Sequence, residues 1–342
     1  MAMILAGDVG GTKCNLALFR REGAVLRLVF QRRLATRNYS GFEDLVNDFL
    51  LQANSAADSA FEPTVAAVGF GLAGVVVDGC LHAENLRWSL DFSALRHKLN
   101  LKNIVLLNDL TATACSLARL SANDFVVLNH GSPEPNATRA VIAAGTGLGQ
   151  AILVWDGREY SVAQSEGGQA DFAPRTEREI RLLEHLRSQL PHVSCEEIVS
   201  GRGFRRIHEF LDASLQHESF RVPEGDSASE ITQRAVAQSC SICVETLNFW
   251  TEMYGAVAGN FALQTLPLGG VYVAGGIAPK ILPKLADGVF FQSFCGNSKL
   301  ASVLARIPVS VVVNEDAPVW GAAYQAMTGG DSSAILTKPS DH

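Results

Sequence analysis

Two glycine-rich turns carry the residue types that could bind a polyphosphate. Gly10-Gly11-Thr12 lies between an apolar segment that ends at Asp8 and a second apolar segment, 14–19. Gly145-Thr146-Gly147 lies between two further apolar segments in the same way. Glycine permits positive φ and lets backbone N–H groups approach an anion closely, and threonine adds a hydroxyl donor. Each turn alone is typical of an ordinary β-turn, but two of them, one in each half, predict a duplicated architecture that grips a polyphosphate from two sides.

Neither turn belongs to the better-known phosphate-binding motifs. A Walker loop requires the spacing Gly-x4-Gly-Lys-Ser/Thr and leads into a helix, and neither feature is present. The run from Gly145 to Gly149 lacks the spacing of a dinucleotide fingerprint and leads into a strand.

Carboxylates and amides follow the apolar segments. Asp8 ends the first of them and offers an oxygen ligand for Mg²⁺. Asn108 and Asp109 end the apolar segment 104–107 and precede a small-residue helix at 111–120. Because ligands of α/β sheets bind beyond the carboxyl ends of the strands, we expect Asn108 and Asp109 to lie in the active site. The alternative, that Asp109 only caps the following helix, stays open from the sequence alone.

Other polar loops extend the candidate site. Glu166 and Gln169 lie in a glycine-bearing loop at 165–174, and loops of this kind often carry function. Gly74 ends a loop after the apolar strand 64–70, where contact with a ligand and a purely structural turn are both open. Gly275 and Gly276 follow a further apolar strand, 271–274.

Bulk properties limit the class of protein. The 342 residues are 47% hydrophobic and 18% charged, and the net charge of −7 with no basic run argues against a nucleic-acid partner. No apolar run is long enough for a transmembrane helix, and the first strand starts too early for a signal peptide, so we expect no membrane partner. The seven scattered cysteines predict reduced thiols in the cytoplasm. Cys240-x-x-Cys243 predicts buried structural thiols rather than a metal site, since no second pair exists.

The order of the expected elements predicts an α/β protein of two lobes. We expect a small lobe at 1–118 with 315–342 and a large lobe at 119–314, as the length exceeds that of one core. The expected helices include one at 41–53, one that begins after Ser200, and a long one at 229–264 with a break near Ser239. The expected strands are 3–8, 14–19, 24–34, 64–70, 81–83, 104–107, 141–144, 149–155, 159–163, 271–274 and 309–313.

Taken together, these residues resemble the bacterial-type glucokinases, within the hexokinase and actin-like ATPase superfamily. The resemblance covers nearly all of residues 3–327. It depends on six modest motifs that stand in the family's order: Gly7-Asp8-Val9-Gly10-Gly11-Thr12, Leu107-Asn108-Asp109, Gly145-Thr146-Gly147-Leu148-Gly149, Glu166-Gly167-Gly168, Ile198-Val199-Ser200-Gly201 and Ala274-Gly275-Gly276-Ile277.

The resemblance implies a duplicated, ribonuclease H-like fold whose two lobes flank a central cleft, and transfer of the γ-phosphate of ATP to the 6-hydroxyl of glucose. It implies that Asp109 is the general base and that Asp8 holds Mg²⁺. It also implies a homodimer. The implied sugar-binding residues are Asn108, Asp109, Glu166, Gln169, Glu196 and Gly74, and the implied ATP-binding residues are Asp8, Gly10, Gly11, Thr12, Gly145, Thr146, Gly147, Gly275 and Gly276.

Two features of the sequence leave alternatives open. The family usually has histidine where this chain has Gln169, which keeps a donor and an acceptor but cannot become charged, so altered sugar affinity or tolerance of epimers is expected. Glu197 is adjacent to Glu196 and competes with it for the same assignment. A kinase for mannose or fructose, a non-catalytic sugar sensor, an actin-like ATPase that acts on a protein, and polyphosphate in place of ATP as the phosphate donor all remain alternatives.

Overall fold

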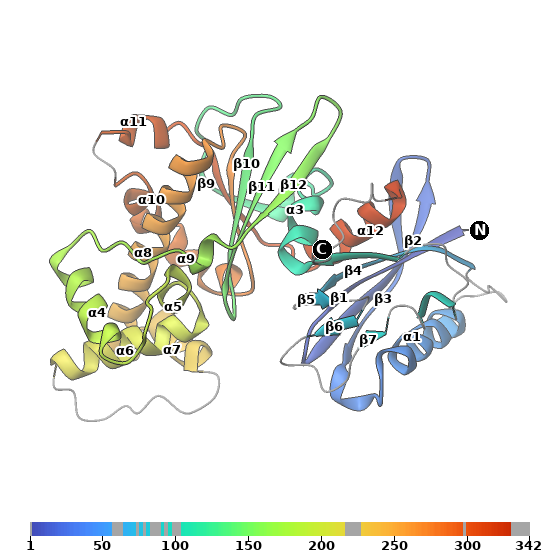
Figure 1. The fold of residues 1–342 in the computed structure, drawn as a ribbon, viewed down its shortest axis with the longest axis horizontal. Coiled ribbons are helices and arrows are strands. Elements are labelled where there is room, and N and C mark those ends of the chain that lie inside the picture. The colour runs from blue at the N-terminus through green and yellow to red at the C-terminus, as the bar shows by residue number, and fades with distance from the viewer. Residues whose placement is uncertain are drawn as a thin grey trace, which may run out of the picture. The chain divides into compact units, whose positions relative to one another are not determined.

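The computed structural model describes residues 2–56, 64–72, 75–77, 80–82, 90–91, 95–97, 104–215, 227–296 and 299–329. The chain divides into two compact units. Unit 1 comprises residues 1–120 with 315–342, and unit 2 comprises residues 121–314. Figure 1 traces both units along the chain.

Unit 1 is built on a five-stranded sheet with the order β3-β2-β1-β4-β8. The three strands β3, β2 and β1 are antiparallel, whereas β1, β4 and β8 run parallel. Its elements are β1 (Ala2–Val9), β2 (Lys13–Glu22), β3 (Val25–Ala35), α1 (Phe42–Ala56), β4 (Thr64–Leu72), β8 (Ile104–Asn108), α3 (Asp109–Ser116) and α12 (Ala317–Thr328), with a short second sheet of β5 (Val75–Val77), β6 (Cys80–His82) and β7 (Leu90–Asp91).

Unit 2 repeats this topology with one strand added. Its sheet has the order β12-β11-β10-β13-β14-β9, in which β12, β11 and β10 are antiparallel and β10, β13 and β14 are parallel. Its strands are β9 (Phe125–Asn129), β10 (Arg139–Ala144), β11 (Leu148–Trp155), β12 (Tyr160–Ser165), β13 (Val271–Ala274) and β14 (Val309–Val312). Its helices are α4 (Glu177–Arg187), α5 (Cys195–Ile198), α6 (Gly201–Leu215), α7 (Ser227–Val236), α8 (Ser241–Thr265), α9 (Leu282–Leu285), α10 (Val289–Phe294) and α11 (Ala301–Leu304), with 3₁₀ turns η3 (Gly167–Gln169) and η4 (Ala278–Ile281).

The duplication places equivalent turns in equivalent positions. The turn at 10–12 joins β1 to β2, and the turn at 145–147 joins β10 to β11, so each is the first hairpin of its sheet. Each hairpin's first strand also pairs in parallel with the next strand of its sheet. Two α/β units with the same strand order confirm the predicted duplicated fold.

Strand β1 shows how alternation positions the chemistry of unit 1. Met3 and Leu5 pack in one core cluster with residues of α1, whereas Ile4 and Ala6 pack in another with residues of α12. Figure 1 labels both helices beside the sheet of unit 1. Because successive side chains of a strand point to opposite faces, Asp8 shares the face of Ile4 and Ala6. Asp8 therefore lies on the face that α12 covers.

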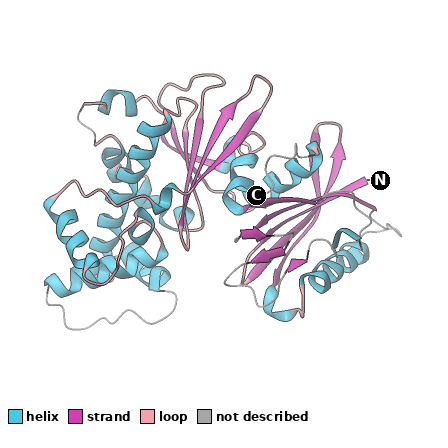
Figure 2. Cartoon of the chain, in the orientation of Figure 1, coloured by secondary structure: helices cyan, strands magenta, loops and turns pink. Residues whose placement is uncertain are grey.

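In unit 2, the long helix α8 organises the core. It is buried nearly all round, and its Trp250 and Tyr254 are fully buried. Figure 2 shows the helices of this unit gathered beside its strands. The Trp250 ring stacks on Phe204 of α6 at a centroid distance of 4.5 Å, and its indole N–H donates to the Ser200 carbonyl at 3.3 Å. The core of unit 2 thus fixes the start of α6.

The predicted break of the long helical pattern near Ser239 is confirmed. Helix α7 ends at Val236, and Gln238 adopts a left-handed conformation with a φ of 54°. The Ser239 N–H donates to Arg234 O and the Gln238 N–H to Ala235 O, which is the hydrogen-bond pattern of a Schellman motif. The chain then starts α8, with Cys240 as its N-cap.

Gly69 of β4 allows α12 to pack closely on the sheet. A Cβ at this position would lie 2.2 Å from the Ala322 carbonyl oxygen. Because backbone cannot yield as a side-chain tip can, we expect Gly69→Ala to lower the free energy of unfolding by about 1–3 kcal/mol. Urea denaturation measures this, with Gly41→Ala as the control, since a Cβ at Gly41 meets nothing within 4 Å. Equal stability of the two variants would contradict this packing.

Candidate active site

The carboxyl ends of β1, β4 and β8 lie in register at one edge of the sheet of unit 1. Asp8 pairs with Gly71, and Gly71 pairs with Leu107, so Asn108 and Asp109 follow directly beyond the strand end. The Asp109 charge raises the pKa of Asp8, as expected for two carboxylates at one sheet edge. The structure therefore brings together Asp8, Asn108 and Asp109, which the sequence had singled out.

Asn108, rather than Asp109, is the N-cap of helix α3. The Asn108 side chain accepts a hydrogen bond from the Leu110 N–H at 2.9 Å, and α3 begins at Asp109 instead of at residue 111. The N-cap position that the alternative assigned to Asp109 therefore belongs to Asn108.

The Asp109 carboxylate is held by backbone and still reaches solvent. Its Oδ1 accepts from the Leu110 N–H at 2.8 Å, and the residue is exposed. Nearby protein nevertheless removes part of its hydration and raises the pKa of Asp109, an effect that the Leu110 hydrogen bond partly offsets. Within the described residues no hydrogen bond engages Oδ2. A fixed carboxylate with a raised pKa and one available oxygen suits a general base.

The ionised form of the Asp8 carboxylate is disfavoured in this structure. Burial is the main cause that raises the pKa of Asp8 to about 6, and the nearby Asp109 adds to it, whereas Lys13 and Arg33 oppose it. The described residues donate no hydrogen bond to the Asp8 carboxylate. A carboxylate that lacks protein donors is suited to a cationic ligand.

The raised pKa of Asp8 has a consequence for stability. Between pH 3.8 and about 6 the folded chain keeps a proton that the unfolded chain has released, so stability falls as the pH rises through this window. We expect Asp8→Asn to be more stable than the unchanged chain at pH 8, on the order of 1–3 kcal/mol, and to lose that advantage at pH 4. Urea denaturation at both pH values without nucleotide tests this, and an Asp8→Asn chain less stable at pH 8 would contradict it.

The first glycine turn is held from behind by one threonine. Thr36 donates its hydroxyl to the Gly11 carbonyl at 2.6 Å and its N–H to the Thr12 carbonyl at 3.1 Å. In the described part of the chain, no acceptor engages the N–H groups of Gly11 and Thr12, which leaves them for an anion. Neither Gly10 nor Gly11 adopts the positive φ that glycine permits. The turn is nevertheless tight at Gly10, where a Cβ would lie 3.1 Å from Lys13 O.

The second glycine turn is tied to the start of α6 and to a glutamate. The Gly145 carbonyl accepts from the Gly201 N–H at 2.8 Å. Glu196 Oε2 accepts from the Leu148 N–H at 2.9 Å, and a Cβ on Gly147 would lie 2.4 Å from that same oxygen. Gly147 is therefore the residue that admits the Glu196 carboxylate beside the turn.

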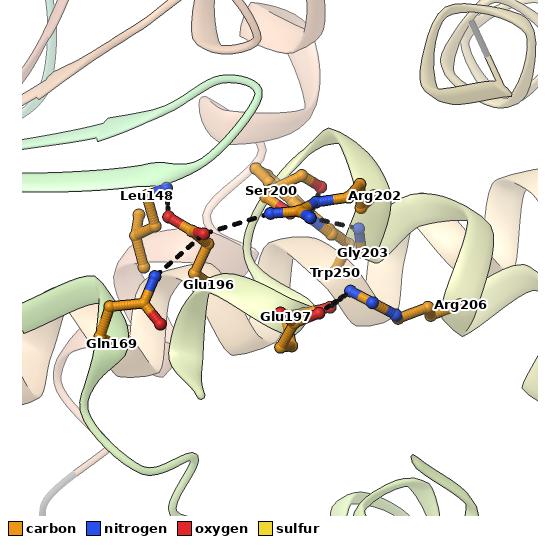
Figure 3. Close-up of polar contacts among 9 residues, drawn as sticks. All are labelled: Leu148, Gln169, Glu196, Glu197, Ser200, Arg202, Gly203, Arg206 and Trp250. Atoms are coloured by element: carbon orange, nitrogen blue, oxygen red, sulfur yellow. Dashed lines mark hydrogen bonds and ion pairs between the residues drawn. The ribbon is translucent and has the colours of Figure 1, made fainter. Parts of the chain in front are cut away.

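Glu196 is the centre of a polar network that Figure 3 shows. Its Oε1 accepts from Gln169 Nε2 at 3.0 Å and from Arg202 at 3.2 Å, and the side chain is 18% exposed. Glu197 instead pairs with Arg206 of α6. The two adjacent glutamates are thus distinguished: Glu196 faces the glycine turn and Gln169, whereas Glu197 braces α5 against α6.

Glu166 lies next to this network. It is exposed at the start of η3, and the Gln169 N–H donates to its carbonyl at 2.9 Å. The neighbouring Gly168 packs directly on β11, where a Cβ would lie 2.0 Å from Leu148 O. Because Gln169 of the same short turn donates to Glu196, the turn that begins at Glu166 borders the network.

A cavity of about 250 Å³ lies beside the second glycine turn, wholly inside unit 2. Gly276 lines it, whereas Gly275 adopts a φ of 90° and packs against Ala144 O. The lining residues are Gly145, Thr146, Gly201, Phe204, Ala228, Ser229, Thr232, Gly276, Ile277, Lys280 and Ile281. Its position next to Gly145 and Thr146 suits the nucleoside of a ligand whose phosphates reach that turn.

Several of these residues were not predicted. Arg202 follows the Ser200 cap and lies six residues after Glu196. This short spacing was the available signal. The helix α7 contributes Ala228, Ser229 and Thr232 to the cavity, and no sequence pattern marked them, because their role depends on how α7 packs. Gly74 lies outside the described residues.

The described helices include none with both the length and the apolar character that a bilayer crossing demands.

The duplicated fold, with a glycine hairpin in each sheet and carboxylates at the sheet edge, defines a sugar kinase of the actin-like ATPase fold. Comparison with known proteins agrees with this class. The family model "Glucokinase" matches residues 5–329. A glucokinase of Nostoc sp. (strain PCC 7120) is 36% identical over 95% of this chain and 99% of its own length.

Two solved structures show the same fold. A glucokinase from an Antarctic psychrotroph superposes with a TM-score of 0.83 at 27% identity, over 95% of this chain and 99% of that one. A ROK-family glucokinase of Streptomyces griseus, solved with glucose and AMPPNP, has a TM-score of 0.63 at 21% identity over 96% of this chain and 100% of that one, which shows the fold alone. The chain belongs to the glucokinase family, and it is an ATP-dependent hexose kinase.

Proposed function

We propose that this chain transfers the γ-phosphate of ATP to the 6-hydroxyl of glucose, with Asp109 as the general base. The observation that carries the assignment is the sheet edge of unit 1, where Asp109 is fixed by the Leu110 N–H directly beyond β8. A phosphoryl-transfer enzyme mainly supplies positioning and charge stabilisation, and a carboxylate base orients the attacking hydroxyl and accepts its proton.

The proposed sugar-binding residues carry carboxylate and amide groups. Asn108 and Asp109 come from unit 1, and Glu166, Gln169 and Glu196 come from unit 2. Carboxylates and amides are suited to sugar hydroxyls because they offer acceptors and donors in pairs.

The proposed phosphate-binding residues are those of the two glycine turns. Gly10, Gly11 and Thr12 would offer N–H and hydroxyl donors to phosphate groups, and Gly145, Thr146 and Gly147 offer the same kinds of donor. The cavity beside Gly276 would hold the nucleoside. The AMPPNP held by the Streptomyces griseus enzyme supports ATP as the donor.

The residues present fit a magnesium ion. The Asp8 carboxylate lies near the Asp109 carboxylate, and the described residues donate no hydrogen bond to it. Its oxygens are the kind of ligand that Mg²⁺ prefers. Bound with ATP, the ion would neutralise charge on the phosphates. Asp8 would hold it, directly or through water.

The cavity assignment predicts a selective effect on ATP. A Cβ on Gly276 meets nothing within 4 Å, so Gly276→Leu would fold and place its side chain in the nucleoside space. We expect the KM for ATP to rise by at least about tenfold, the loss that follows when ~1.4 kcal/mol of binding is removed, with the KM for glucose unchanged. Steady-state kinetics in each substrate measure this. A rise confined to the KM for glucose would contradict the assignment.

A hexose panel separates the open alternatives. With ATP and Mg²⁺, we expect ADP release with glucose to exceed that with mannose or fructose in kcat/KM. A preference for either of the other hexoses would move the assignment to that sugar, and binding of glucose without turnover would favour a sensor. Polyphosphate in place of ATP, tested in the same assay, decides the phosphate donor.

Two further proposals concern the state of the protein. A homodimer is implied by the resemblance, and light scattering of the purified chain tests it. A cytoplasmic location is supported by the cysteines, since all six whose side chains the structure describes are free thiols.

A further inference from the structure

A histidine and two cysteines from separate helices meet in unit 2, away from the residues assigned to catalysis. One ligand atom from each of His208, Cys240 and Cys243 lies within 4.8 Å of the other two. It is the one such metal-competent cluster within the residues that the structure describes. His208 lies on α6, whereas Cys240 and Cys243 lie at the start of α8, so the sequence separates the histidine from the cysteine pair by 32 or more residues.

We propose that His208, Cys240 and Cys243 form a binding site for a zinc-class divalent cation. Two thiolates and one imidazole are a known ligand set for zinc, with a fourth position for water. Tetrahedral zinc holds such ligand atoms roughly 3.5–3.8 Å apart. Side-chain rotations that move the ligand atoms by about 1 Å would therefore complete the geometry. The sequence predicted structural thiols because it showed no further ligand beside the Cys pair, and the fold supplies one.

The backbone around the cysteines is fixed before any ion binds. The Schellman turn at 237–239 ends α7, and Cys240 then caps α8, where its Sγ accepts from the Cys243 N–H at 3.4 Å. A Cys-x-x-Cys pair at a helix start places both sulfur atoms on one side of the turn. The preformed turn lowers the entropic cost of assembling the site.

The surroundings of the cluster combine shielding with access. His208 is 2% exposed and Cys243 is fully buried, whereas Cys240 is half-buried and gives an ion a way in. Burial lowers the pKa of His208, although the charges of Asp212 and Glu209 act to raise it. The lowered pKa keeps the imidazole neutral, as a metal ligand must be. Burial also raises the pKa of Cys243 to about 12, so the ion has to displace the thiol proton on binding.

The site would link the helices that wall the nucleotide cavity. His208 lies one turn beyond Phe204 on α6, and Cys240 follows α7, which contributes Thr232. A bound cation would fasten α6 to the α7–α8 turn and so stiffen two walls of that cavity. This role is separate from phosphoryl transfer.

Cobalt titration of the full-length protein tests the site. In phosphine-reduced, oxygen-free protein, Co²⁺ should produce a thiolate charge-transfer band and the visible bands of tetrahedral cobalt, saturating at about one equivalent per chain. Zn²⁺ should then displace it. The absence of a thiolate band in the unchanged chain would overturn the proposal. So would the finding that Cys240 and Cys243 form a disulfide and that the chain takes up no metal once this disulfide is reduced.

Matched variants locate the ligands. Cys240→Ser retains a capping oxygen for α8, and Cys243→Ala keeps a small apolar side chain, so both should fold and lose the charge-transfer band. His208→Asn should weaken cobalt binding by at least about tenfold. Cys295→Ser, which removes a half-buried thiol outside the cluster, should leave the band unchanged. A band retained in both cluster cysteine variants would overturn the assignment.

Thermal unfolding gives a second readout. Zn²⁺ should raise the Tm of the unchanged chain and of Cys295→Ser, but not that of Cys243→Ala, because only an ion that binds the folded state stabilises it. An equal rise in all three would mean that zinc binds elsewhere. Absorbance and Tm do not depend on turnover, so failure of this site leaves the proposed kinase activity untouched, and the reverse also holds.

Discussion

Asp109→Asn is expected to lower kcat for glucose by about 10²–10⁴-fold while glucose binding stays measurable. The Leu110 N–H donates to Oδ1 of residue 109, so an asparagine would place its oxygen there and turn its NH₂ toward the sugar. A donor would then face the hydroxyl, and no group could accept its proton. Stopped assays for kcat and calorimetry for glucose binding separate the two effects.

The control for Asp109→Asn is a carboxylate on the same unit that the site does not use. Asp48 of α1 accepts from the Tyr39 hydroxyl at 2.6 Å, and Asp48→Asn should leave kcat unchanged. Because the raised pKa of Asp109 sets its ionisation, kcat of the unchanged chain should also fall on the acid side. Near-normal turnover of Asp109→Asn would rule out its role as the base.

Glu196→Gln is expected to lower kcat/KM for glucose by about 10- to 100-fold, with most of the change in KM. Both carboxylate oxygens already accept hydrogen bonds: Oε2 from the Leu148 N–H, and Oε1 from Gln169 and Arg202. A glutamine would bring its NH₂ against one of these donors, and an unsatisfied polar group of this kind costs about 1–3 kcal/mol. The loosened turn and the lost charge would both weaken the sugar site.

Glu197→Gln is the matched control for Glu196→Gln. It changes the neighbouring glutamate in the same way, but Glu197 pairs with Arg206 instead of facing the glycine turn. We expect its KM for glucose to stay unchanged and any loss to appear in stability. Of these two variants, Glu196→Gln should discriminate less between glucose and its deoxy analogues, whereas Glu197→Gln should not. If both variants behave alike, Glu196 has a structural role alone.

Glu166 gives a separate test of sugar recognition. A site built to pair with a substrate hydroxyl rejects an analogue that lacks it by ~10⁴–10⁵, because buried polar groups are then left unpaired. Deoxy-sugar kinetics on Glu166→Gln should show weaker discrimination than the unchanged chain. Glu166 is exposed in this structure, which contains no sugar. If Glu166→Gln discriminates against deoxy sugars as strongly as the unchanged chain, the sugar does not cover Glu166.

The sequence was sufficient for the fold because its signals are local. Apolar runs on either side of Gly10 and Gly145 specify hairpins. The carboxylates directly follow apolar runs, so the sequence alone places them at strand ends. The break near Ser239 was also predictable from the pattern, although the left-handed residue is Gln238, a type that rarely adopts that conformation.

The remaining features depend on packing between segments far apart in the chain. Nothing next to Glu196 and Glu197 tells which one faces the glycine turn, since Arg206 and Leu148 decide it from other elements. The cavity wall on α7 and the meeting of His208 with Cys240 have the same origin. Helix α3 starts two residues earlier than predicted, because the Asn108 side chain replaces the missing backbone partner.

The most direct test of the account is phosphorus NMR of the purified chain with ATP, Mg²⁺ and glucose. We predict that the ATP signals decline as those of ADP and glucose 6-phosphate rise together, and that Asp109→Asn suppresses both product signals. Appearance of inorganic phosphate in place of the sugar phosphate, or no glucose-dependent loss of ATP, would contradict the account.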